Sequence, residues 1–368
     1  MNEGMSDQLT KQDVIRLLSD PSATTRADTA AKVAKSLDKA QLSPGERQLA
    51  EDIVRRMARD TALRVRQTLA ENLKNSNALP RDVALMLARD VEAVSLPILS
   101  LSTVLSDDDL FELVRDGTSA KQSAIANRPQ VSSSLAEVII ETAGEETIAV
   151  LVANEGAEIT ENALERVVDR FGESENIQEP LVRRSKLPIT IAERLVNMVS
   201  ERLQEYLVAH HELPTSVASD LVLQTRERAT INLVNVNTDE ADLEKMVAQM
   251  ARSGRLGPSI LMRALCMGDM AFFETGMSFL AGVPMTNARL LIHDGGSLGL
   301  RSIYEKAGMP LTLLPAVRVA IDVFHETYLD GEERDIERHR RRMIERILTQ
   351  NEDMAAEDID YLLNKIMT

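Results

Sequence analysis

The chain has 368 residues and a formal net charge of −16, because 58 acidic residues outnumber 42 Lys and Arg. This balance argues against a dedicated nucleic-acid binder, whose affinity depends on clustered basic side chains that contact phosphates. The single cysteine, Cys266, excludes an intramolecular disulfide and a cysteine-based zinc cluster, and its apolar neighbours predict a buried structural thiol.

The N-terminus is polar and lacks the apolar stretch of a secretory signal, and residues 1–8 are predicted to be disordered. No apolar run approaches the roughly 20 residues that a membrane-spanning helix needs. We therefore expect a cytoplasmic protein without a membrane contact.

Three helices are expected before the regular part of the chain, at residues 13–18, 26–37 and 46–59, where apolar positions recur at helical spacing. Segment 20–26 resembles segment 59–66, which indicates that a divergent repeat begins there. Terminal units of repeat arrays commonly diverge, because one of their faces meets water.

One residue template then returns six times. Each copy is counted from an apolar anchor residue. The first position after the anchor is Pro, Ser or Thr, and the fifth is Ala or Leu. The eighth and ninth positions after the anchor are apolar, and so is the sixth position before it. The steps between anchors are 26, 26, 28, 28 and 26 residues, a period that indicates a stacked repeat array. The anchors are Leu79, Leu105, Val131, Ile159, Leu187 and Leu213.

The unit that begins at Leu105 shows how the template predicts helices. Ser106 can cap a helix, and three aspartates follow it in the first turn, where the helix dipole favours negative charge. Gly117 is a plausible stop, and a second short helix is expected over residues 120–126, before Pro129. Each unit should therefore be two short helices that bury their apolar faces only by stacking.

Such units form an α-solenoid, which we assign to residues 9–235 with the regular repeats at about 73–225. The template stops applying after about residue 230, and residues 236–368 are predicted to form a C-terminal helical subdomain. Its last part, residues 334–348, reads as a long charged helix in which acidic and basic side chains compensate each other. The expected helix stops are Gly254, Gly257, Gly268, Gly282 and Gly308.

Several stretches of the sequence resemble the sequences of a known family. The repeat junctions read ANRPQVS at residues 126–132, VRRSKLP at 182–188 and AHHELP at 209–214. Residues 259–284 read SILMRALCMGDMAFFETGMSFLAGVP, and residues 291–310 read LIHDGGSLGLRSIYEKAGMP. Over about residues 15–325 the chain resembles an uncharacterised alphaproteobacterial domain-of-unknown-function family with HEAT-like helical repeats. The resemblance implies an all-α solenoid of HEAT-like repeats and supplies no catalytic residues.

The junctions before the anchors are the first candidate binding surface, since equivalent turns of a solenoid line up along one edge. Arg128, Arg183 and Arg184 could form an anion-binding cluster, because a guanidinium pairs bidentately with phosphate or carboxylate. The alternative is that these residues are solvated or bind the last carbonyls of the preceding helices. His210 and His211 complete the candidate set, although adjacent histidines on a helix diverge by about 100° and do not favour a shared metal.

The fragment His293-Asp294-Gly295-Gly296 is the most enzyme-like part of the sequence. It could host acid–base chemistry, but its spacing matches no phosphate-binding fingerprint, and a helix stop with Asp294 as a cap is the alternative. We predict no catalytic residue, no metal and no cofactor.

Methionines and phenylalanines concentrate in the C-terminal part and could form an adaptable partner surface. Ordinary core filling is the alternative explanation for them. The residues chosen for the partner surface are Met267, Phe272, Phe273 and Met277.

The function expected from these observations is that of a non-catalytic helical-repeat scaffold or adaptor, which binds a protein partner in bacterial regulation or signalling. Self-association is also possible, whereas a nucleic-acid partner is not expected. One alternative is a small-anion or nucleotide sensor that uses the junction arginines. A third is a HEAT-like enzyme that acts on nucleic acid, which the acidic composition and the absence of Trp disfavour.

Overall fold

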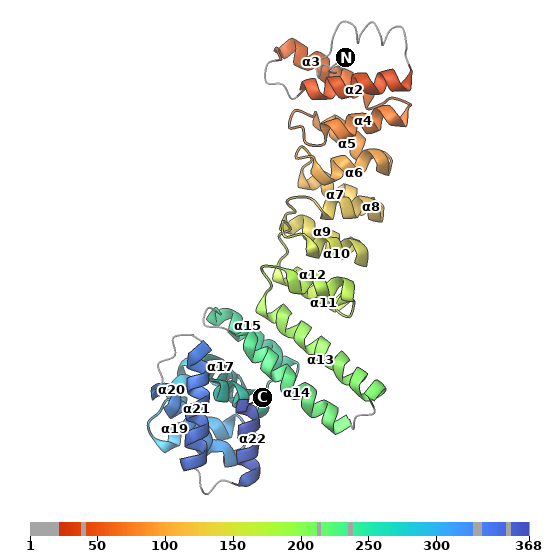
Figure 1. The fold of residues 1–368 in the computed structure, drawn as a ribbon. Coiled ribbons are helices and arrows are strands. Elements are labelled where there is room, and N and C mark those ends of the chain that lie inside the picture. The colour runs from red at the N-terminus through yellow and green to blue at the C-terminus, as the bar shows by residue number, and fades with distance from the viewer. Residues whose placement is uncertain are drawn as a thin grey trace. The chain divides into compact units, whose positions relative to one another are not determined.

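The computed structural model describes residues 22–37, 42–211, 215–234, 238–326, 333–350 and 355–367. These residues form helices joined by turns, with no strand among them and one isolated bridge between Val131 and Ala157, so the all-α prediction is confirmed (Figure 1). The chain divides into two compact units, Met1–Lys186 and Leu187–Thr368. The predicted boundary at 235/236 lies inside the second unit.

Within the described residues, the first unit starts with the helices α2 (Ala23–Leu37), α3 (Pro44–Met57) and α4 (Leu63–Leu73). The first two confirm the helices expected at 26–37 and 46–59, and the helix expected at 13–18 lies outside the described residues. Ser43 and Glu46 form a reciprocal capping box at the start of α3, which satisfies amide groups that a free helix end leaves without acceptors.

Four regular helix pairs follow, and they stack in sequence order (Figure 1). Ser106, Ser132 and Thr160 cap the first helices of their pairs, each accepting from a backbone N–H three residues on, as the template predicts. The pairs are α5 (Arg81–Ala88) with α6 (Glu92–Leu101), α7 (Asp107–Arg115) with α8 (Ser119–Ala126), α9 (Ser133–Thr142) with α10 (Glu145–Ala153), and α11 (Glu161–Phe171) with α12 (Glu175–Arg183).

Template positions form the core of this unit. In the unit anchored at Leu105, the anchor, Leu110, Leu113 and Val114 are all buried. The second helices α6, α8, α10 and α12 pack on one another in succession, as do the first helices α7, α9 and α11. Short helices that could not fold alone are therefore stabilised by their neighbours, as in other repeat arrays.

The fifth and sixth anchors do not produce short helix pairs, which corrects the prediction. Each is followed by one long helix, α13 (Ile189–His211) and α14 (Thr215–Leu233), which pack against each other. Three of the four earlier pairs carry a glycine between their two helices, Gly117, Gly144 or Gly172, whereas neither long helix contains Gly or Pro. The absence of these residues favours a continuous helix, but it does not by itself decide the outcome, because α5 and α6 separate at residues 89–91 without Gly or Pro.

The rest of the second unit is a packed group of short and medium helices (Figure 1). Gly268 and Gly282 end two of them in left-handed conformation, with φ of +84° and +59°, as expected of helix stops. The predicted charged helix at 334–348 is confirmed within α21. The elements are α15 (Glu240–Arg252), α16 (Pro258–Met267), α17 (Met270–Ala281), α18 (Met285–Ile292), α19 (Ser297–Lys306), a 3-10 turn (Leu311–Leu313), α20 (Leu314–Glu326), α21 (Glu333–Gln350) and α22 (Ala356–Met367).

The predicted partner surface lies inside this core, which is a second correction. Met267, Phe272, Phe273 and Met277 are all buried, because α16 and α17 pack against each other and are covered by neighbouring helices. Cys266 is likewise fully buried, and burial raises the pKa of its thiol to about 12, which fits a structural thiol.

Candidate functional site

Polar side chains in the turns between repeats form hydrogen bonds that connect each repeat to the preceding one. Arg128, in the turn after α8, donates from Nη1 to the Leu99 carbonyl and from Nη2 to the Ser102 carbonyl, each at 2.6 Å. Both carbonyls lie at the C-terminal end of α6, where helical carbonyls lack intrahelical donors. The buried guanidinium therefore satisfies one helix end from the next repeat.

Asn154 and Arg184 make the same kind of contact in the following units. Asn154, at the end of α10, donates from Nδ2 to the carbonyls of Ala126 and Arg128, at 2.9 and 2.7 Å. Arg184, at the end of α12, donates to three carbonyls around the end of α10, at 2.7–3.1 Å. We call Arg128, Asn154 and Arg184 the junction clamps.

The contacts of the junction arginines favour capping over anion binding. Burial lowers the pKa of Arg128 and of Arg184, and the guanidinium of each is bound to backbone carbonyls of the preceding repeat. Arg183 differs, because its side chain is 77% exposed and pairs with Glu179 one turn earlier. His210 and His211 lie in the last turn of α13, and their side chains fall outside the described part of the chain.

A groove of about 720 Å³ lies beside the first helix of the first regular repeat. The loop between α3 and α4, one side of α5 and the turn after α5 form its walls. The half-buried side chains of Leu85 and Met86 give it an apolar floor. We call it the α4–α5 groove; its lining residues are Ala58, Arg59, Asp60, Thr61, Arg66, Asp82, Leu85, Met86, Arg89 and Asp90.

Ion pairs between successive helices fix the rim of this groove. Arg66 binds both carboxylate oxygens of Asp90, at 2.5 and 3.1 Å, and also the Asp60 carbonyl. Asp60 in turn holds Arg26 through two contacts, and these interactions keep the pKa of its carboxyl below its usual range. Such bidentate pairs hold side chains in one geometry, so the rim of the groove has a fixed arrangement.

Arg59 is the exception on the rim. Its side chain is exposed and makes no ion pair among the residues that the structure describes, whereas Arg66 and Arg89 are each paired with a carboxylate. The groove therefore combines an apolar floor with a cationic group at its edge, Arg59, that has no ion-pair partner in the described part of the chain.

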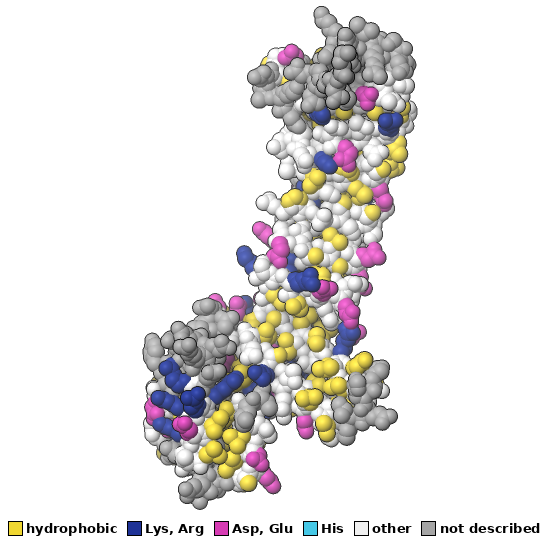
Figure 2. All heavy atoms as spheres, viewed as in Figure 1, with side chains coloured by type: hydrophobic (Ala, Val, Ile, Leu, Met, Phe, Trp, Pro, Cys, Tyr) yellow, Lys and Arg dark blue, Asp and Glu magenta, His cyan; other side chains and the backbone are white. Residues whose placement is uncertain are grey.

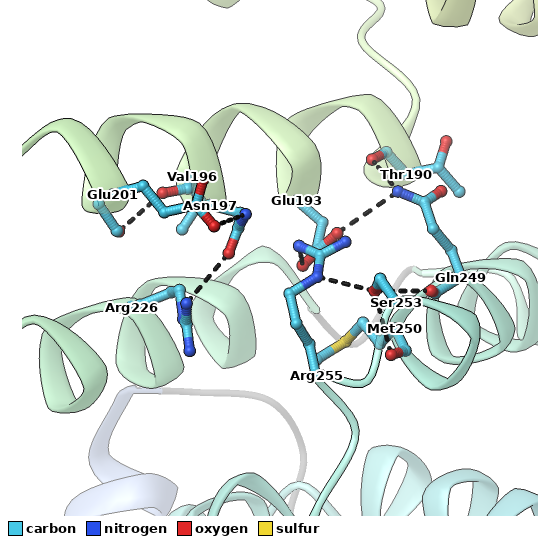
Figure 3. A network of polar contacts seen from close by, with 11 residues as sticks. Thr190, Glu193, Val196, Asn197, Glu201, Arg226, Gln249, Met250, Ser253 and Arg255 are labelled. Atoms are coloured by element: carbon cyan, nitrogen blue, oxygen red, sulfur yellow. Dashed lines mark hydrogen bonds and ion pairs between the residues drawn. The ribbon is translucent and has the colours of Figure 1, made fainter. Parts of the chain in front are cut away.

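The second unit contains a polar network centred on Glu193 of α13, which Figure 3 shows between α13, α14 and the region of α15. The Glu193 carboxylate is 2% exposed and contacts Arg255 at 2.5 Å and Gln249 at 3.5 Å. Burial raises the pKa of Glu193, and the nearby arginines oppose that rise. Gln249 of α15 and Arg255 just after it thus contact Glu193 and the Thr190 carbonyl of α13, so these contacts hold α13 and α15 together (Figure 3).

The histidine of the enzyme-like fragment belongs to another network of the second unit. His293 lies 2.6 Å from Glu274 through Nε2 and 2.7 Å from His325 through Nδ1, and the two imidazole rings are stacked. A carboxylate only accepts, so Nε2 of His293 donates to Glu274. Asp294 accepts hydrogen bonds from the backbone amides of Gly296 and Gly299. This is the turn with Asp294 as a cap that the sequence offered as the alternative to acid–base catalysis.

The described part of the chain holds neither a metal cluster nor a membrane span. Among these residues, no group of three or more His, Cys, Asp and Glu side chains is placed to hold an ion, and no helix is long and apolar enough to cross a bilayer. On the face in Figure 2, acidic and basic side chains of the first unit are interspersed.

Sequence reasoning missed the α4–α5 groove. Its ion pairs join residues about one repeat apart, such as Arg66 and Asp90 at 24 positions or Arg89 and Glu112 at 23. A search for opposite charges at the repeat period would have pointed to these pairs.

The fold and this site define an all-α helical-repeat protein with an attached helical unit. The chain belongs to the DUF2336 family, described as an uncharacterised protein conserved in bacteria, whose sequence profile matches residues 94–357. Comparisons with curated proteins and with solved structures found no match.

Proposed function

We propose that the protein is a non-catalytic scaffold or adaptor, and that the α4–α5 groove binds a segment of a protein partner in a bacterial regulatory pathway of the cytoplasm. The observation that carries the proposal is an apolar floor, Leu85 and Met86, inside a rim whose ion pairs are already formed. A preorganised site loses little side-chain entropy when it binds.

The chemistry of the groove indicates the kind of segment it would take. An apolar anchor residue would cover Leu85 and Met86, and an acidic residue beside it would pair with exposed Arg59. The anion-sensor alternative has no comparable support, because Arg128 and Arg184 are engaged by backbone carbonyls.

The test is site-specific photo-crosslinking in native lysate. A photoreactive residue replaces Thr61, an exposed lining residue, in one variant and Leu49 in the other, a 63% exposed position on α3 that does not line the groove. We expect a discrete crosslinked partner from position 61 and none from position 49. With the purified partner, Arg59→Glu should weaken binding about tenfold, in the range of one charge pair. Identical crosslinks from both positions, or no crosslink from position 61, would contradict the proposal.

A further inference from the structure

The second unit contains a buried charged cluster that the groove does not involve. Glu227 comes from α14, Ser259 and Arg263 from α16, and Lys365 from α22. Lys365 Nζ lies 2.5 Å from Glu227 Oε2 and 2.6 Å from Ser259 Oγ. Three helices far apart in sequence thus bring polar groups to one place.

The charges of this cluster do not balance. Arg263 Nε also binds Glu227 Oε2, at 3.1 Å, so two basic side chains share one carboxylate oxygen. The side chains of Arg263, Glu227 and Lys365 are only 1%, 4% and 6% exposed. Burial lowers the pKa of Lys365, which Glu227 opposes. Removing charges from water is costly unless they are fully paired, so a surplus cation here needs a partner.

The guanidinium of Arg263 indicates where a negatively charged group would bind. Its Nη1 and Nη2 atoms are buried and have no hydrogen-bond partner among the described residues. Buried polar groups in proteins nearly always have one, and the guanidinium fork matches the spacing of two oxyanion oxygens. Side chains on a helix lean toward its N-terminus, which directs Arg263 toward Ser259 one turn earlier.

The start of α16 adds further donors on the same side. This ten-residue helix has Gly257 as its N-cap and Pro258 in its first turn, and Gly257 has no side chain to accept from the first amides. Helix N-termini attract anions through free N–H groups and the helix dipole. Ser259 and Tyr361 are only half-buried, so the cluster reaches the surface there.

We propose that Arg263, Lys365, Ser259 and the N-terminus of α16 bind a small oxyanion the size of phosphate or sulfate. The anion offsets the surplus positive charge beside Glu227 and accepts hydrogen bonds from the two terminal nitrogens of Arg263. This site uses none of the junction arginines and is independent of the α4–α5 groove.

The test uses the full-length protein and inorganic phosphate at constant ionic strength, with thermal unfolding and isothermal titration as readouts. We expect a saturable rise in the melting temperature and a measurable heat of binding. Arg263→Met should weaken phosphate binding at least tenfold, and it should still fold because Glu227 and Lys365 remain as a balanced pair. Glu227→Gln should act in the opposite direction and tighten phosphate binding. Arg341→Gln, at an exposed site on α21, is the matched control and should bind like the wild type.

Further variants keep the test decisive. Should Arg263→Met not fold, Ser259→Ala leaves every buried charge in place and is expected to weaken phosphate binding several-fold. A phosphate monoester such as glycerol phosphate distinguishes a free ion from the phosphate end of a larger ligand, and binding of either supports the site. A wild-type protein that gives no heat and no saturable shift with phosphate, or an unchanged affinity in Arg263→Met, overturns the proposal.

Discussion

The two units use charged side chains differently. In the first unit, the ion pairs that connect different helices join residues 23 to 34 positions apart, about one repeat, and most of their members keep contact with water. In the second unit, Arg263 and Glu227 are 36 positions apart, Glu193 and Arg255 are 62 apart, and Glu227 and Lys365 are 138 apart. These second-unit pairs are largely buried.

This difference teaches how each unit is stabilised. The stability of a repeat array is close to the sum of the stabilities of single repeats and of the interfaces between neighbouring repeats. The loss of one junction clamp should therefore destabilise mainly the two repeats that it joins. A buried charge network that ties distant helices together makes their folding interdependent. The predictions below test this contrast, from the largest effect to the smallest.

The largest effect is expected for Glu227→Ala. The substitution leaves the cationic groups of Arg263 and Lys365 buried together without a carboxylate, which should lower the free energy of unfolding of the second unit by about 3–5 kcal/mol. Chemical denaturation measures it, and Arg263→Met added to Glu227→Ala should restore part of the loss. Glu244→Ala, at an exposed position on α15, is the control and should stay within about 0.5 kcal/mol of the wild type. If Glu227→Ala lowered the free energy of unfolding no more than Glu244→Ala does, the buried charges of the second unit would not stabilise it differently from the ion pairs of the first unit.

A smaller, local effect is expected for Arg128→Ala. The Leu99 and Ser102 carbonyls lose a charged donor in a buried place, which should cost about 2 kcal/mol of stability in the first unit. Arg183→Ala is the matched control, and removing this exposed pair with Glu179 should change the stability of the unit by less than about 0.5 kcal/mol. Equal losses in the two variants would show that Arg128 is not a clamp. Hydrogen exchange should place the Arg128→Ala effect in the repeats around α6 and α8.

The sequence predicted the parts of the fold that local rules control. Ser106 and Ser132 cap helices where the template placed them, and Gly268 ends its helix as expected. The length of helix α13 did not follow from the template, because the template specifies apolar positions and not helix ends, and no glycine occurs between Leu187 and Gly254. A template gives the register of apolar positions, but a helix ends only where something ends it.

The candidate sites were less predictable, for a physical reason. The sequence does not show whether Arg128 and Arg184 are solvated or cap a helix. The position of the helix end in the preceding repeat decides between these two roles. Phe272 and Phe273 were placed on a surface because their burial depends on helices outside their own segment. The meeting of Glu227 and Lys365 across 138 positions follows no period that a single sequence displays.

The smallest effect is a pH dependence expected from His339 of α21. Its side chain is fully buried against Gly268, Nε2 lies 3.3 Å from the Leu265 carbonyl, and Nδ1 has no partner among the described residues. Burial lowers the pKa of His339 from its ordinary value of 6.5, because the charged imidazole would lose its hydration. The unfolded chain therefore binds this proton more readily than the folded chain does. The contribution of His339 to stability is present above pH 6.5 and is lost as the pH falls below it, with a slope of at most about 1.4 kcal/mol per pH unit.

The difference between wild type and His339→Gln isolates this contribution, since the other titrating groups are common to both proteins. Unfolding free energies measured from pH 8 to pH 5 should converge as the pH falls, because the glutamine variant lacks the proton-linked loss. Parallel curves for the wild type and His339→Gln would mean that α21 does not bury its histidine against the end of α16. The contrast between the units would then rest on the charges around Glu227 and Glu193 alone.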